Sequence, residues 1–138
     1  MLRNLLIPTA LTLLGLIELS SAQQPEKLDV PIMIGGDDEI DACGSTGEVK
    51  GLDPKGDGFL SVRSGPGGSH FREVDRLFNG NYVYICGESG PWLAVVYSNR
   101  RELGGDCGVA TPQRVRQAYS GPCRQGWIHS RYVRVVAG

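Results

Sequence analysis

Short runs of alternating apolar and polar residues, each bounded by glycine or proline, most constrain what this chain can fold into. Residues 59–63 alternate and are followed by the turn-forming segment 64–68. Further runs of this kind lie at 74–77, 82–86, 92–97, 126–129 and 132–136. Twenty glycines and eight prolines among 138 residues exclude a helical bundle, because both residue types interrupt helices. We predict an all-β fold, a small, partly open antiparallel barrel of five short strands.

Residues 1–22 have the pattern of a secretory signal peptide. Arg3 precedes an apolar run at 5–17, and three small residues end at Ala22. The run is shorter than the roughly 20 residues of a membrane-spanning helix, although an uncleaved membrane anchor is the alternative. We predict cleavage after Ala22 and export to the periplasm or the extracellular space, without stable membrane insertion.

Export indicates that the four cysteines form disulfides, because an even number of cysteines in an oxidising compartment is usually paired. None of them forms a C-x-x-C motif, so the usual spacing of a zinc site is lacking. Three pairings are possible, and locality favours Cys107–Cys123, which leaves Cys43–Cys86.

Charge divides the mature chain into two parts. Residues 23–57 contain nine acidic and three basic residues, a net charge of −6, and we expect a flexible, solvated N-terminal arm. Residues 58–138 contain ten basic residues, all arginine, and five acidic ones, a net charge of +5. The two parts either attract one another or face different partners. The whole-chain charge of −1 argues against nucleic-acid binding.

The second part resembles the bacterial SH3 (SH3b) domain. Residues 60–67 read Leu-Ser-Val-Arg-Ser-Gly-Pro-Gly, similar to the family's L-N-V-R-S-G-P-G signature, with Ser61 in place of asparagine. Three further motifs follow in the family's order, at 77–80, 87–92 and 126–133. The resemblance implies an SH3b domain at 58–138. The segment 98–125 departs from it, because it holds five arginines and two cysteines where the family has a tight hairpin. A long loop of this kind is either a binding surface or a structural elaboration.

The residues do not favour an enzyme. His70 and His129 are the only histidines, and we expect both to be structural or exposed. Oxidised cysteines leave no thiol nucleophile. Residues 53–64 are weakly similar to a calcium loop, but Lys55 and Ser64 stand where oxygen ligands are required, so we expect a turn. We predict no catalytic residues, no metal and no cofactor.

Binding is therefore the expected function. Strand alternation predicts that Leu60, Val62, Val83, Ile85, Val95 and Ile128 point inward, and it puts two tyrosines of residues 82–86 on the outer face. SH3-type barrels bind extended chains on aromatic-lined grooves, and arginine pairs with carboxylates. The candidate ligand-binding residues are Tyr82, Tyr84, Trp92, Arg114 and Arg116. The resemblance implies recognition of peptidoglycan or an envelope peptide. The alternative is a protein-interaction or inhibitor module that acts through the loop 98–125.

Overall fold

The computed structural model describes residue 15 and residues 27–138, and these are the residues discussed below. The predicted signal peptide, apart from residue 15, lies outside them. The strands are β1 (Met33–Ile34), β2 (Asp37–Asp41), β3 (Ser45–Val49), β4 (Leu60–Arg63), β5 (Glu73–Leu77), β6 (Tyr82–Ser89), β7 (Trp92–Tyr97), β8 (Pro112–Gln113), β9 (Gln117–Ala118), β10 (Arg124–His129) and β11 (Val133–Ala137). One short 3-10 helix, η1 (Ser130–Tyr132), precedes β11.

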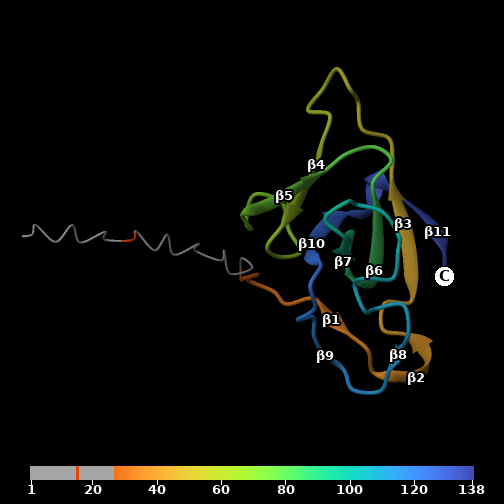
Figure 1. The fold of residues 1–138 in the computed structure, drawn as a ribbon. Coiled ribbons are helices and arrows are strands. Elements are labelled where there is room, and N and C mark those ends of the chain that lie inside the picture. The colour runs from red at the N-terminus through yellow and green to blue at the C-terminus, as the bar shows by residue number, and fades with distance from the viewer. Residues whose placement is uncertain (1–14, 16–26) are drawn as a thin grey trace, which may run out of the picture.

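Seven strands form one antiparallel sheet in the order β11-β3-β6-β7-β10-β4-β5 (Figure 1). The all-β prediction is confirmed, and each predicted run of alternating residues overlaps a strand. The predicted partly open barrel of five strands is not confirmed, because the sheet has seven strands and its edge strands β11 and β5 do not pair with each other. The sheet also contains β3, a strand from the segment expected to be an arm, between β11 and β6.

The sheet is covered on both faces. The side chains of Leu93, Val95 and Tyr97 on β7 pack in one buried cluster with apolar residues of β3, β4, β5, β6 and β10. Ala94 and Val96, which alternate with them, pack in a second cluster with residues of β1 and of the segment 98–125. Burial on both faces explains why residues 92–97 form a nearly continuous apolar run.

The expectation of a flexible, solvated arm is wrong for residues 27–49. β1 pairs with β9, and β2 pairs with β8. The acidic N-terminal segment, described from residue 27 to residue 57, therefore forms two small sheets with the insertion, residues 98–125 (Figure 1). Leu28, Ile32 and Ile34 are buried, because they cover the second face of the main sheet. Further contact comes from Trp127, whose indole Nε1 donates to the Val30 carbonyl oxygen at 3.0 Å. The acidic side chains of β2 remain exposed.

The predicted core is largely confirmed. Five of the six residues expected to point inward are buried, and the sixth, Ile85, is half-buried against the same cluster. The prediction for Tyr84 is wrong in its exposure. Tyr84 does lie on the opposite face from Val83, but only 6% of it is exposed, because the N-terminal segment and the insertion cover that face.

The Gly-rich signature packs closely around one aromatic ring. A Cβ atom on Gly65 would lie 2.4 Å from the ring of Phe71, so glycine is required there. Ser64 is fully buried, and its hydroxyl donates to Asp29 at 2.5 Å, which ties the signature loop to the N-terminal segment. Within the described residues, no helix is long and apolar enough to cross a membrane.

Candidate ligand pocket

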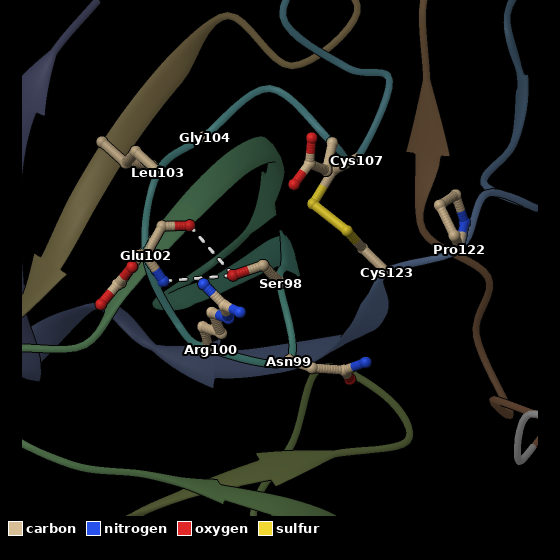
Figure 2. Close-up of a pocket in the computed structure, with 10 residues that line it drawn as sticks. Ser98, Asn99, Arg100, Glu102, Leu103, Gly104, Cys107, Pro122 and Cys123 are labelled. Carbon is tan, nitrogen blue, oxygen red and sulfur yellow. Dashed lines mark hydrogen bonds between the residues drawn. A yellow bond between two sulfur atoms is a disulfide. The ribbon is translucent and has the colours of Figure 1, made fainter.

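A pocket of about 520 Å³ lies between the segment that follows β7 and the Cys107–Cys123 disulfide (Figure 2). Residues 98–104 curve around one side of it, and the disulfide stands on the other. Its lining residues are Ser98, Asn99, Arg100, Glu102, Leu103, Gly104, Asp106, Cys107, Pro122 and Cys123. Every lining residue except Pro122 and the two cysteines precedes Cys107 in one continuous segment. The pocket is therefore built entirely by residues of the segment 98–125.

Arg101 anchors the first half of the pocket wall to the sheet. Its guanidinium Nη2 donates to both carboxylate oxygens of Asp75 on β5, at 3.2 and 3.1 Å. Its carbonyl oxygen accepts from the Tyr82 amide at 2.8 Å. Arg101 has a φ of 58°, a left-handed conformation that is uncommon for a residue with a side chain. These bonds hold the backbone in that turn and thereby fix the position of the preceding residue, Arg100.

Tyr84 anchors the second half of the wall. Its hydroxyl oxygen accepts from the amides of Gly104 and Gly105, at 3.2 and 3.1 Å. This bond explains why a tyrosine, and not a purely apolar residue, is buried at this point of β6. Tyr84 therefore holds this half of the wall through its hydroxyl, and its side chain is buried and not on an open surface.

Tyr119 holds the disulfide side of the pocket. Its hydroxyl donates to the Cys107 carbonyl oxygen at 2.8 Å and accepts from the Cys123 amide at 3.1 Å. Both predicted disulfides, Cys43–Cys86 and Cys107–Cys123, are present. Both walls of the pocket are therefore held by hydrogen bonds and a covalent link within the protein.

Asp75 lies at the centre of the charged groups beneath the wall. It accepts hydrogen bonds from the Tyr97 hydroxyl at 2.8 Å and from Arg124 at 3.2 Å, in addition to Arg101. Burial raises the pKa of Asp75, but the Arg76 amide, the Tyr97 hydroxyl and the two guanidinium groups outweigh it and lower the pKa overall. Burial, reinforced by the Asp75 charge, raises the pKa of Tyr97.

Most arginines of the insertion are paired within the molecule. Arg101 and Arg124 bind Asp75, and Arg114 binds Asp38 at 2.9 Å. The last pair joins the insertion to the acidic segment, so the two oppositely charged parts of the chain do attract one another. Arg100 and Arg116 have no hydrogen-bond or ion-pair partner within residues 27–138. The arginines of the insertion therefore do not gather at the pocket, whose lining includes one of them, Arg100.

The structure does not bring the predicted ligand-binding residues together. Trp92 lies at the opposite end of β7 from the pocket, half-buried beside His129, with ring centroids 5.3 Å apart. Tyr82 is half-buried on β6. Arg114 and Arg116 are exposed between β8 and β9, in the part of the chain that faces the acidic segment.

Residues that the sequence reasoning did not select line the pocket, chiefly Arg100 and Asp106. The sequence signal that could have found them was their position, since both lie shortly before Cys107 in the long segment 98–125. His129 is half-buried, and its Nδ1 accepts from the Arg131 amide at 3.1 Å. Among residues 27–138, no group of three or more histidine, cysteine or acidic side chains is arranged to hold a metal ion.

Comparisons of the chain with protein-family models, curated proteins and solved structures find no match.

Proposed function

We propose that this protein is an exported, non-enzymatic binding module of the SH3b type that recognises peptidoglycan or an envelope peptide. The observation that carries the proposal is the preformed pocket, whose two walls are held by Asp75, Tyr84 and a disulfide. In this proposal β4, β5, β6, β7 and β10 correspond to the strands of an SH3-like barrel, and the disulfide-linked insertion supplies the binding site. Two disulfides are typical of an oxidising, exported environment.

Co-sedimentation with purified sacculi tests the proposal. The oxidised protein lacking residues 1–22 is incubated with sacculi at low and at physiological salt. We expect it to sediment with them, and we expect Arg100→Gln to reduce the bound fraction. Arg116→Gln is the matched control, because Arg116 is also exposed and without a partner among the described residues but does not line the pocket. No co-sedimentation even at low salt would exclude a cell-wall ligand.

A second candidate, an interaction module for an envelope protein, is favoured by two exposed apolar side chains, one on β2 and one in the segment that follows β8. Val115 is 66% exposed between Arg114 and Arg116, and Ile40 on the adjacent β2 is 58% exposed. An apolar centre with charged neighbours is suited to contact with another protein. A stoichiometric partner captured from envelope extract, and lost on replacing Arg114 and Arg116 with alanine, would support this candidate.

A further inference from the structure

The charged side chains that line the pocket are one guanidinium, of Arg100, and two carboxylates, of Glu102 and Asp106. Arg100 and Asp106 both line it, and neither has an ion-pair or hydrogen-bond partner within residues 27–138. Glu102 also belongs to the lining, but its carboxylate points away from the disulfide (Figure 2). The Arg100 guanidinium and, next to the disulfide, the Asp106 carboxylate are therefore available to a molecule that enters the pocket.

Each of these two charges is attached to a fixed neighbour. Arg100 precedes Arg101, whose side chain binds Asp75 and whose carbonyl oxygen binds the Tyr82 amide. Asp106 precedes Cys107, which is buried, disulfide-bonded and hydrogen-bonded to Tyr119. The backbone positions from which the two charges project are thus set by the fold.

The remaining lining suits a short aliphatic segment between two charged groups. Leu103, Pro122 and the Cys107–Cys123 disulfide contribute apolar surface to the pocket. A guanidinium pairs preferentially with a carboxylate in a planar, two-bond arrangement, and a carboxylate accepts from an ammonium group. A ligand with a single charge would satisfy one group and meet repulsion or an unpaired charge at the other.

We propose that the pocket binds a zwitterionic peptide or amino-acid unit, with its free carboxylate on Arg100 and its free ammonium group on Asp106. This inference rests on the proposed function of the pocket as a peptide site. It specifies the groups that the ligand must carry, and it predicts that blocking either group weakens binding.

Nuclear magnetic resonance titration of the oxidised protein lacking residues 1–22 tests the inference with three probes: trialanine, N-acetyl-trialanine and trialanine amide. The amides of Gly104 and Gly105 report on the pocket wall, because both donate to Tyr84. We expect trialanine to shift these signals and to bind about tenfold or more tightly than either blocked peptide, as loss of a hydrogen bond to a charged group implies.

Two variants assign each ligand group to its side chain. Arg100→Gln is expected to weaken trialanine about tenfold and to leave trialanine amide unchanged, because the amide has no carboxylate to lose. Asp106→Asn is expected to weaken trialanine and to leave N-acetyl-trialanine unchanged. Both residues are exposed and have no ion-pair or hydrogen-bond partner among residues 27–138, so the fold tolerates both changes. Arg116→Gln is the control and should bind all three probes as the parent does.

Equal affinity for the free and the blocked peptides would overturn the inference, as would the absence of shifts at Gly104 and Gly105 with all three probes. The two proposals fail separately. Binding to sacculi together with equal affinities would leave the proposed function intact and exclude a zwitterionic ligand. The expected response to trialanine without binding to sacculi would support the ligand class and exclude the cell wall as its source.

Discussion

Asp75 is the residue on which most of the local order around the pocket depends. Its carboxylate joins a tyrosine from the end of β7, an arginine from the pocket wall and an arginine from the start of β10. An unpaired guanidinium is costly when it is shielded from water, and the Arg101 side chain is 24% exposed. The carboxylate therefore holds the wall on the side opposite the disulfide.

Asp75→Asn is expected to lower the free energy of unfolding by about 2 kcal/mol, because it removes charge from several hydrogen bonds at once. Chemical denaturation of the oxidised protein measures the change. Asp106→Asn serves as the control, since Asp106 is exposed, and its change should stay within about 0.5 kcal/mol. Equal stability of Asp75→Asn and the parent protein would contradict this account of the wall.

Acid is expected to destabilise the protein through the same residue. The pKa of Asp75 is lowered in the folded chain, and hydrogen bonds from Ser61 and Ser64 lower those of Glu73 and Asp29. A lowered pKa gives stability that is present above the unfolded value and is lost as pH falls through the folded value. For Asp75 the loss begins near the ordinary value of 3.8 and continues below it.

Denaturation midpoints measured between pH 7 and pH 2.5 (a range chosen to span these carboxyl groups) should therefore fall on the acid side. The fall should be smaller in Asp75→Asn, which has no proton to gain at this position. A pH profile of Asp75→Asn parallel to that of the parent would show that Asp75 contributes no pH dependence.

Two disulfides attach the segments that cover the second face of the main sheet. One joins the N-terminal segment to β6, and the other closes the insertion. Cys86 at the middle of β6 binds Cys43, 43 residues earlier, and Cys107 binds Cys123 across 16 residues. Restriction of the unfolded chain contributes more for the longer loop. The Cys43–Cys86 disulfide is therefore expected to contribute more to the free energy of unfolding than the Cys107–Cys123 disulfide beside the pocket.

Paired cysteine-to-serine replacements test this order. Replacing Cys43 and Cys86 is expected to cost about 4 kcal/mol, and replacing Cys107 and Cys123 about 3 kcal/mol. Denaturation of each variant with its remaining disulfide intact gives the two values. A larger loss for the pocket disulfide than for the Cys43–Cys86 link would contradict the order.

The strand β10 requires glycine where it crosses β4. A Cβ atom on Gly126 would lie 2.3 Å from Cγ1 of Val62 and 3.1 Å from the Arg63 carbonyl oxygen. Gly126→Ala is therefore expected to lower the free energy of unfolding by about 1–3 kcal/mol, a typical cost of overpacking a core. Gly68→Ala is the matched control, because a Cβ atom there meets nothing within 4 Å. Similar thermal midpoints for the two variants would show that the sheet accommodates the extra carbon.

At the scale of the whole molecule, the N-terminal segment belongs to the domain. It supplies β3 to the main sheet and covers the second face of that sheet with buried residues, including Ile32. It also provides Cys43, the disulfide partner of Cys86. Without it, an apolar face of β7 and a free thiol would be exposed.

A chain beginning at Gly58 is expected not to fold to a stable monomer. It lacks β3 and the cover over Ala94 and Val96, and exposed apolar surface promotes association. Size-exclusion chromatography and amide dispersion in nuclear magnetic resonance spectra give the result, with the chain beginning at residue 23 as the control. A dispersed spectrum from a monomeric chain beginning at Gly58 would show that the SH3b-like region folds alone.

Local pattern was sufficient to predict several features from the sequence. Alternation predicted the strands at 59–63 and 82–86, because side-chain period is a property of the strand itself. Locality in the chain favoured the disulfide pairing that is observed. The conclusion that the fold is all-β likewise followed from composition and turn residues.

What covers each face was decided only by the tertiary structure. The alternation put Tyr84 on the face opposite Val83. Whether that face meets water depends on distant segments that cover it, which include Ile34, 50 residues before Tyr84, and Gly104, 20 residues after it. Long-range packing and ion pairs such as Arg114–Asp38 leave no periodic pattern in the sequence. For this reason the sequence of the acidic segment, which pairs with other strands, led to the prediction of a solvated arm. The sequence by itself determined the strands β4, β5, β6, β7, β10 and β11, because side-chain alternation is local. The tertiary structure decided the pairing of β1, β2, β3, β8 and β9 and the pocket, because these depend on which distant residues meet.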